Sequence, residues 1–224
     1  MSPRTSRPAL RHPLFARFYE KVAAPALDKA GITEHRRRLL SGLAGEVIEI
    51  GAGNGLNFAH YPPEVKRVVA VEPEPRLRAL AEQSARTAPV PVDVVDGLAE
   101  RLPVADGSFD AAVVCLTLCS VADPRAALAE LHRVLRPGGQ LRFFEHVRAD
   151  SPAMRRTQRV LDATVWPLFM GGCHTGRDTQ AAISAAGFTL ASVERFPFPE
   201  TRLPSPAATH ILGTAERPHP GGRP

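Results

Sequence analysis

The sequence predicts an α/β fold in which helices cover both faces of a mostly parallel sheet. Three observations indicate this fold class. Short β-branched segments alternate with longer helical patterns from residue 46 onward, a glycine-rich turn follows the first such segment, and prolines, glycines and capping residues punctuate the boundaries. The 224 residues suit one medium domain with extensions. We expect a single domain over residues 13–215, between disordered tails at 1–12 (basic) and 216–224 (rich in Pro and Gly).

The elements can be assigned in chain order. Residues 13–43 predict one or two helices that fold over the domain as a lid. The strands that follow are predicted at Glu46–Ile50, Arg67–Val71, Pro91–Val95, Phe109–Leu116, Gln140–His146, Phe188–Arg195 and Ala208–Thr214. Helical patterns between them cover Asn54–His60, Pro75–Arg86, Asp123–Leu135, Pro152–Met170 and Thr175–Ala186. Asp123 and Pro124 are typical of a helix start, and Arg136–Gly139 is expected to close that helix before the next strand.

Charge and apolar patterning limit the partners. The formal charge of +5 is concentrated in residues 1–40, which hold nine basic and three acidic residues, whereas the remaining 184 hold 19 and 20. We therefore expect a solvated arm and no nucleic-acid partner. The apolar run Ala111–Leu118 is too short to span a bilayer and no secretory signal is visible, so a cytoplasmic protein is expected. The cysteines, Cys115, Cys119 and Cys173, lack zinc-type spacing, which predicts reduced thiols and no metal.

The segment Glu49–Gly55 is the sharpest motif. Gly51, Gly53 and Gly55 follow a predicted strand, at the sheet edge where ligands of parallel sheets bind, and glycine lets the backbone approach a ligand closely. Leu56 stands where a dinucleotide-binding loop would have its third glycine, which disfavours NAD. S-adenosylmethionine (SAM), a nucleoside-like cofactor without phosphate, fits this loop better.

A carboxylate completes the predicted cofactor site. Glu72 follows the second strand, 21 residues after Gly51. A carboxylate at that position can accept hydrogen bonds from both ribose hydroxyls. A glycine loop or an acidic residue alone is a weak signal, but both at this spacing predict a SAM site.

Four motifs resemble those of class I SAM-dependent methyltransferases of the small-molecule type. They are Glu49–Gly55, Val71–Pro73, Leu102–Asp110 and Arg133–Gly139. The resemblance implies a Rossmann-like sheet of seven strands whose last strand is antiparallel. It also implies that Glu49 contacts the methionine part of SAM, that Glu72 contacts the ribose, and that Leu98 and Ala99 hold the adenine. Asn57 and Pro73 are further expected cofactor contacts. Cys115 and Leu116 would line the cofactor after the fourth strand.

Segments outside the cofactor half resemble a narrower group. Asn57–Pro63, Leu118–Val121, Phe144–Val147 and Phe169–His174 are similar to the animal methyltransferase-like proteins that methylate thiols at the endoplasmic reticulum, and to their bacterial relatives. The resemblance implies a small thiol acceptor. Oxygen, nitrogen or carbon acceptors, including a lipid amine, stay open. So does a non-catalytic SAM-binding protein that docks on nucleic acid through its basic arm. No pattern in the sequence determines the oligomeric state.

Acceptor chemistry can be assigned to particular side chains. A thiol reacts as thiolate, so a base would help, and His146 is the candidate, with Glu145 either orienting it or capping the strand end. His146 can equally be read as a loop anchor. Cys119, Ser120, Trp166 and Cys173 are the predicted acceptor contacts. A less favoured hypothesis has all three cysteines converge on a trivalent arsenical.

The aromatic residues before the sheet are part of the predicted lid. Tyr19 would reach the cofactor, while Phe15 and Phe18 would pack the lid. Ordinary helix docking explains Tyr19 about equally well and the two phenylalanines better. Trp166 likewise predicts either an apolar acceptor wall or plain packing.

Overall fold

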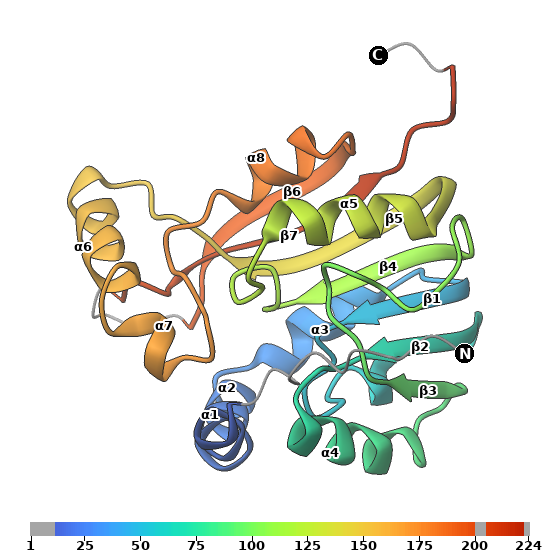
Figure 1. Ribbon diagram of the computed structural model, residues 1–224, viewed down its shortest axis with the longest axis horizontal. Helices are drawn as coiled ribbons and strands as arrows, with labels where there is room; N and C mark the ends of the chain where they lie inside the picture. The colour runs from blue at the N-terminus through green and yellow to red at the C-terminus, as the bar shows by residue number, and fades with distance from the viewer. Residues whose placement is uncertain (1–11, 200–204, 222–224) are drawn as a thin grey trace, which may run out of the picture.

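The computed structural model confirms the predicted fold class. It describes residues 12–199 and 205–221. Seven strands form one mixed sheet in the order β3-β2-β1-β4-β5-β7-β6, with β7 antiparallel to both of its neighbours (Figure 1). The other paired strands are parallel. The carboxyl ends of β1, β2 and β4 therefore meet at one edge, where the glycine loop begins.

The strands lie close to their predicted positions. Their bounds are β1 Gly45–Ile50, β2 Val65–Val71, β3 Val92–Val95, β4 Phe109–Cys115, β5 Leu135–His146, β6 Thr189–Pro197 and β7 Thr209–Glu216. Within a strand, successive side chains enter two different cores. Ile48 faces the core that contains Leu128, whereas Val47 faces the core that contains Leu39.

Helices cover both faces of the sheet. α5 (Pro124–Val134) and α8 (Thr179–Ala185) supply side chains to the first core, and α3 (Ile32–Leu40) and α4 (Pro75–Ala85) supply them to the second. Asp123 caps α5 by accepting from the amides of Arg125 and Ala126, as its position before Pro124 predicts. These helices fix the strand ends that carry the site.

The segment before the sheet forms two helical stretches. The first contains α1 (Pro13–Phe18), a π-helical turn η1 (Tyr19–Ala23) and α2 (Ala24–Lys29), and the second is α3. Gly31, with φ of 93°, separates them. Pro25 has no amide hydrogen, and the π-turn precedes it directly, with Ala24 N–H donating to Tyr19 O. Together with α6 (Pro152–Asp162) and α7 (Trp166–Phe169), α1 and α2 lie at the end of the sheet toward which the parallel strands point (Figure 1).

Two predicted helices are wrong in extent. Asn54–His60 contains only one 3-10 turn, η2 (Phe58–His60), because Gly55 adopts φ of 79° and interrupts any longer helix. Pro152–Met170 divides into α6 (Pro152–Asp162) and α7 (Trp166–Phe169). Pro167 cannot donate the amide that a continuous helix needs, and its ring would collide with the carbonyl of residue 163.

The turn before β5 also differs from the prediction. Arg136–Gly139 lies within the strand, as an irregularity between the pairs Phe109–Leu135 and Ala111–Gln140. Gly138 N–H donates to Arg217 O, and Arg217 N–H donates to Gly139 O. Strand β7 includes Glu216, which was predicted to begin the C-terminal tail. The basic tail, 1–12, lies outside the described residues except for His12, and the domain limits stay predictions.

Within residues 12–199 and 205–221, none of the helices combines the length and the apolar character that crossing a bilayer requires.

Candidate functional site

The glycine loop after β1 has the backbone that its sequence predicts. Gly51, Gly53 and Gly55 all have positive φ, at 68°, 58° and 79°. A Cβ on Gly51 would lie 2.5 Å from the Thr117 side chain, and one on Gly53 would lie 3.6 Å from the Tyr19 ring. A side chain would therefore be strained by the positive φ at both positions, and at Gly51 it would also collide with Thr117. Tyr19, on the N-terminal helical stretch, lies against the loop, as the predicted lid requires.

Glu72 lies beside this loop at the end of β2. Its Oε2 accepts from Gly53 N–H at 2.8 Å and its Oε1 accepts from Glu74 N–H at 2.9 Å. Each oxygen keeps a second lone pair for another donor. Burial raises the pKa of Glu72 to about 7, although the two backbone hydrogen bonds oppose the shift. The carboxylate is thus oriented by the loop, with capacity left for a pair of hydroxyls.

Glu49 forms a buried polar network with side chains from three other segments. It accepts from Asn57 Nδ2 at 2.8 Å and from Tyr61 Oη at 2.7 Å. Arg36 Nη1 donates to Asn57 Oδ1 at 2.6 Å and approaches Cys115 Sγ at 3.5 Å. Burial raises the pKa of Glu49 to about 7 and that of the Cys115 thiol to about 11. The network brings together the predicted residues Glu49, Asn57 and Cys115.

Two members of this network were not predicted. Arg36 belongs to a run of three arginines that reads as a solvated face, yet it is only 5% exposed. Arg36 follows Ile32 by four residues and precedes Leu39 by three, which places it on the same buried face of α3. This helical spacing was the sequence signal that could have identified it. Tyr61 gives no comparable signal, because the turn that precedes it determines its direction.

Glu145 holds the segment that follows β4. The carboxylate is fully buried: its Oε1 accepts from the amides of Thr117 and Leu118 at 2.7 and 2.9 Å, and its Oε2 accepts from Cys119 N–H at 3.2 Å. Leu116 has φ of 56° there, an unusual value for a leucine. Two roles were expected for Glu145, either capping the strand end or orienting His146. This geometry favours the capping role.

Cys119, His146 and Cys173 meet in one buried cluster. His146 Nε2 is 3.0 Å from Cys173 Sγ, and the ligand-type atoms of all three residues lie within 4.8 Å of one another. The cluster joins three segments: the loop after β4, the end of β5 and the loop after α7. His174 N–H donates to Cys119 O at 2.8 Å, which ties the first and third together.

The environment of this cluster determines its protonation. Burial lowers the pKa of His146, but the hydrogen bond and negative charge of Cys173 outweigh it, and the net direction is upward. The pKa of Cys173 is also raised, by its hydrogen bond with Cys119 and by burial. Cys115 is not part of the cluster and lies beside Arg36 instead. The hypothesis of three converging cysteines is therefore wrong in its geometry.

The segment 152–175 brings Trp166 to the cluster. Trp166 Nε1 donates to Cys173 Sγ at 3.2 Å. Asp162, at the end of α6, accepts from Thr175 N–H at 2.7 Å and from Gly176 N–H at 2.8 Å, which anchors the segment.

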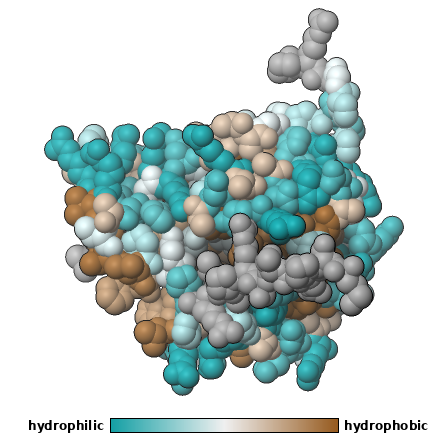
Figure 2. Space-filling model, viewed as in Figure 1, coloured by the Kyte–Doolittle hydropathy of each residue, from teal (hydrophilic) through white to brown (hydrophobic). Residues whose placement is uncertain are grey.

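The apolar surface beside this segment connects it to the N-terminal helices. Leu168 and Phe169 on α7 are exposed, and Figure 2 shows apolar side chains at this edge of the molecule. Phe15 is in contact distance of Gly171, where an added Cβ would lie 2.5 Å from the ring. Phe18, predicted to pack the lid, is 38% exposed.

The remaining predicted residues lie in loops at the same edge of the sheet. Pro73 and Ser120 are half-buried, and Ser120 Oγ is 3.4 Å from Cys119 Sγ. Leu98 forms an isolated bridge with Arg101, and Ala99 is buried in the first core. The methyl group of Ala99 is therefore packed in the core, and a contact with adenine would have to use its backbone.

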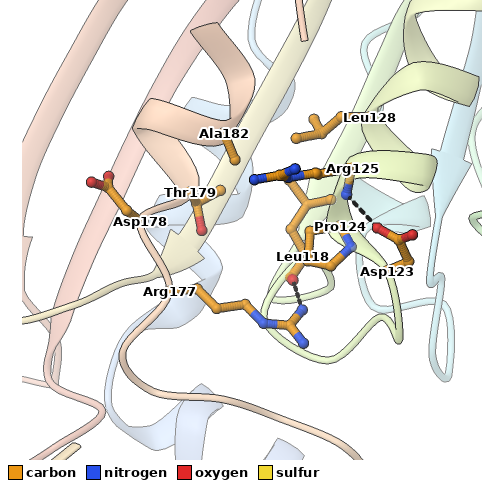
Figure 3. A pocket seen from close by; sticks show the side chains of 9 residues that line it. All are labelled: Leu118, Asp123, Pro124, Arg125, Leu128, Arg177, Asp178, Thr179 and Ala182. Atoms are coloured by element: carbon orange, nitrogen blue, oxygen red, sulfur yellow. Dashed lines mark hydrogen bonds between the residues drawn. The ribbon is translucent and has the colours of Figure 1, made fainter. Parts of the chain in front are cut away.

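A separate surface pocket of about 290 Å³ lies between the start of α5 and α8 (Figure 3). Asp123, Arg125, Arg177 and Thr179 are among its lining residues. Arg177 Nη1 donates to Leu118 O at 2.5 Å, next to Cys119 in the chain. None of the predicted cofactor or acceptor residues lines this pocket, so it is distinct from the predicted site.

Comparison with known proteins agrees with this geometry. Residues 48–143 match the model of a methyltransferase domain family. The chain is 35% identical over 218 residues to thiol S-methyltransferase TMT1B of Rattus norvegicus, covering 95% of this chain and 86% of the relative. It is 37% identical over 182 residues to TMT1B of Homo sapiens, covering 79% and 73%.

A solved structure supports the fold. A SAM-dependent methyltransferase of Thermotoga maritima, described as a possible histamine N-methyltransferase, superposes with a TM-score of 0.66 at 24% identity, covering 91% of this chain and 98% of the other. The family assignment is supported by three structural features, which are the glycine loop, the oriented carboxylate after β2 and the antiparallel β7. It is also supported by the relatives, which match over most of their length. This chain belongs to the class I SAM-dependent methyltransferases.

Proposed function

We propose that this SAM-dependent methyltransferase transfers its methyl group to a small, largely apolar thiol. The observation that carries the proposal is the extent of the similarity to the thiol S-methyltransferases, which spans 95% of the chain and not only the cofactor half. It includes the loop after β4, the end of β5 and segment 152–175, the parts that meet in the cluster. Acceptor preference in this fold depends on such parts, since the cofactor half is shared by enzymes with many acceptors.

The residues around the glycine loop fit SAM. Glu72 keeps lone pairs for the ribose hydroxyls, and the three glycines of the loop, Gly51, Gly53 and Gly55, have no side chains to block a ligand. The methionine part would lie near Glu49, Asn57 and Tyr19, where the carboxylate faces a cationic ammonium group. Pro73, Leu98 and Ala99 would adjoin the nucleoside, and Cys115 and Leu116 would line the cofactor after β4.

The buried carboxylates make SAM binding sensitive to charge. The pKa of Glu49 and that of Glu72 are each raised to about 7 by burial. A bound sulfonium and ammonium would favour the ionised carboxylates, so binding near neutral pH would release protons. Arg36 offsets part of this negative charge, because it is buried in the same network.

The acceptor side offers a soft, water-poor environment. Trp166, Cys119 and Cys173 are in or beside the cluster, and Ser120 adjoins it. When bound, SAM supplies an electrophilic methyl on a sulfonium, and the protein gains chiefly by aligning the acceptor with it and excluding water. His146 is the proposed base for the thiol proton. Its Nε2 is engaged by Cys173, so an acceptor thiol would have to displace that contact.

A panel of matched acceptors tests the proposal. Formation of S-adenosylhomocysteine would be measured with apolar thiols, with the alcohols and phenols of the same skeleton, and with amines and a phospholipid. Product with thiols alone supports the proposal. Product with only an oxygen, nitrogen or carbon acceptor keeps the methyltransferase and rejects the thiol.

A further inference from the structure

We propose that Cys119, His146 and Cys173 form a binding site for a soft divalent cation of the Zn²⁺ type. The three side chains come from segments far apart in the sequence, yet their ligand-type atoms lie within 4.8 Å of one another. The cysteine spacing carries no zinc motif, and for this reason the sequence predicted no metal. Among the described residues, this is the one group of three or more His, Cys, Asp or Glu side chains gathered closely enough to bind an ion.

The ligand chemistry and spacing suit such a cation. Zn²⁺ binds thiolate sulfur at about 2.3 Å and imidazole nitrogen at about 2.0–2.1 Å, so tetrahedral ligands lie about 3.5–3.8 Å apart. His146 Nε2 and Cys173 Sγ, at 3.0 Å, need to separate only slightly to admit an ion between them. Two thiolates also neutralise a divalent ion, so the filled site would bury no net charge.

Without an ion the pKa of Cys173 is raised, so its thiolate would form as the bound ion displaces the proton, and neighbouring groups then support it. Trp166 Nε1 donates a hydrogen bond to Cys173 Sγ, an outer contact of the kind that tunes a metal-bound thiolate. The Arg177 guanidinium lies nearby and donates to the carbonyl oxygen of Leu118, the residue before Cys119. Backbone contacts fix the two cysteine loops relative to each other: His174 N–H donates to Cys119 O, and Glu145 holds Cys119 N–H. A preorganised pair of thiols of this kind has little entropy left to lose on binding an ion.

A set of two cysteines and one histidine leaves one position of a tetrahedral ion open. Sites with three protein ligands keep that position for water or a substrate. If the proposed thiol acceptor occupies it, coordination would lower the thiol pKa and release the proton to solvent. The bound thiolate would then attack the SAM methyl, so that an S–CH₃ bond forms on the acceptor and the sulfonium C–S bond breaks to leave S-adenosylhomocysteine. This consequence rests on the proposed function, whereas the cation site does not. His146 would act here as a ligand instead of a base.

Cobalt binding tests the site without any acceptor. The reduced full chain would be freed of metal with a chelator and titrated with Co²⁺, which replaces Zn²⁺ and absorbs visible light strongly in a tetrahedral thiolate site. We expect one equivalent to bind with thiolate charge-transfer bands, and Zn²⁺ to displace it. Cys119→Ser, Cys173→Ser and His146→Ala should each weaken Co²⁺ binding at least tenfold, whereas Cys115→Ser, the matched control, should leave it unchanged.

Two readouts separate loss of the site from loss of the fold. Far-UV circular dichroism reports whether each variant still folds. Independently, Zn²⁺ should protect Cys119 and Cys173 of the unmodified protein from alkylation, as measured by peptide mass spectrometry, and should leave the labelling of Cys115 as it was. Absence of stoichiometric Co²⁺ binding, bands that persist in the three variants, or no protection by Zn²⁺ would overturn the proposal. If Co²⁺ binds but no thiol is methylated, the proposed function fails while the cation site stands. The two failures are therefore distinguishable from each other.

Discussion

Replacing Glu145 should destabilise the protein in a graded way. Its carboxylate accepts three backbone hydrogen bonds, two at Oε1 and one at Oε2, and is fully buried. In Glu145→Ala all three amides lose their buried acceptor, and at about 1.5 kcal/mol for each hydrogen bond the free energy of unfolding should fall by about 4.5 kcal/mol. In Glu145→Gln the amide oxygen can still accept from the Thr117 and Leu118 amides. Only the hydrogen bond from Cys119 N–H is lost, so the free energy of unfolding should fall by about 2 kcal/mol.

Urea denaturation followed by circular dichroism measures this difference. The free energy of unfolding would be compared for both variants, with Glu100→Ala as the matched control. Glu100 also accepts from two backbone amides, but it is half-buried and its partners, Ala122 and Asp123, are exposed, so water can replace the lost bonds and the substitution should cost less than about 1 kcal/mol. A Glu145→Ala effect below about 1 kcal/mol, or equal effects of Ala and Gln, would refute the assigned role of the carboxylate.

Three further predictions concern SAM and turnover. Gly53→Arg should lower SAM affinity at least about 100-fold, as measured by calorimetry, because the new side chain fills the space between the glycine loop and Tyr19. The control Gly107→Arg also has a positive φ, but no heavy atom lies within 4 Å of its added Cβ, so SAM affinity should not change. Equal effects of the two variants would contradict the assignment of the loop to SAM. SAM affinity should rise as pH increases through about 7, because the raised pKa of Glu72 keeps part of it protonated below that pH and the ionised form is the better acceptor. Glu72→Gln should bind SAM about tenfold more weakly, and its SAM affinity should rise less steeply with pH. If the pH dependence of SAM affinity were the same in this variant as in the unmodified protein, the assignment of Glu72 to the ribose would be contradicted. His146→Ala should slow turnover at least about tenfold while SAM affinity stays within about threefold, and equal losses in both would assign it to cofactor binding instead.

The sheet could be predicted because its signals are local. Buried parallel strands read as β-branched runs, and capping residues such as Asp123 mark helix starts without help from distant residues. The glycine loop and Glu72 were equally readable, because both follow directly from strand ends. The helix predicted at Asn54–His60 is wrong because Gly55 adopts a positive φ, which interrupts a helix.

The acceptor side depended on contacts that no local pattern reveals. Cys119 and Cys173 are 54 positions apart in the chain, and only the folded loops bring them to His146. Glu145 is adjacent to His146 in the sequence, but successive side chains of a strand point to opposite faces. The Glu145 carboxylate therefore contacts amides of the neighbouring loop. Arg36 is the exception, since helical spacing alone would have flagged it as buried.

A direct competition between a thiol and its oxygen counterpart tests the central claim most directly. The purified protein would receive SAM with an isotopically labelled methyl group and an equimolar pair of an apolar aryl thiol and the phenol of the same skeleton, and the products would be analysed by mass spectrometry. Thiol transfer predicts label on sulfur, with the phenol recovered unmodified. Label on oxygen alone, or bound SAM that yields no methylated product with any thiol, would contradict the account.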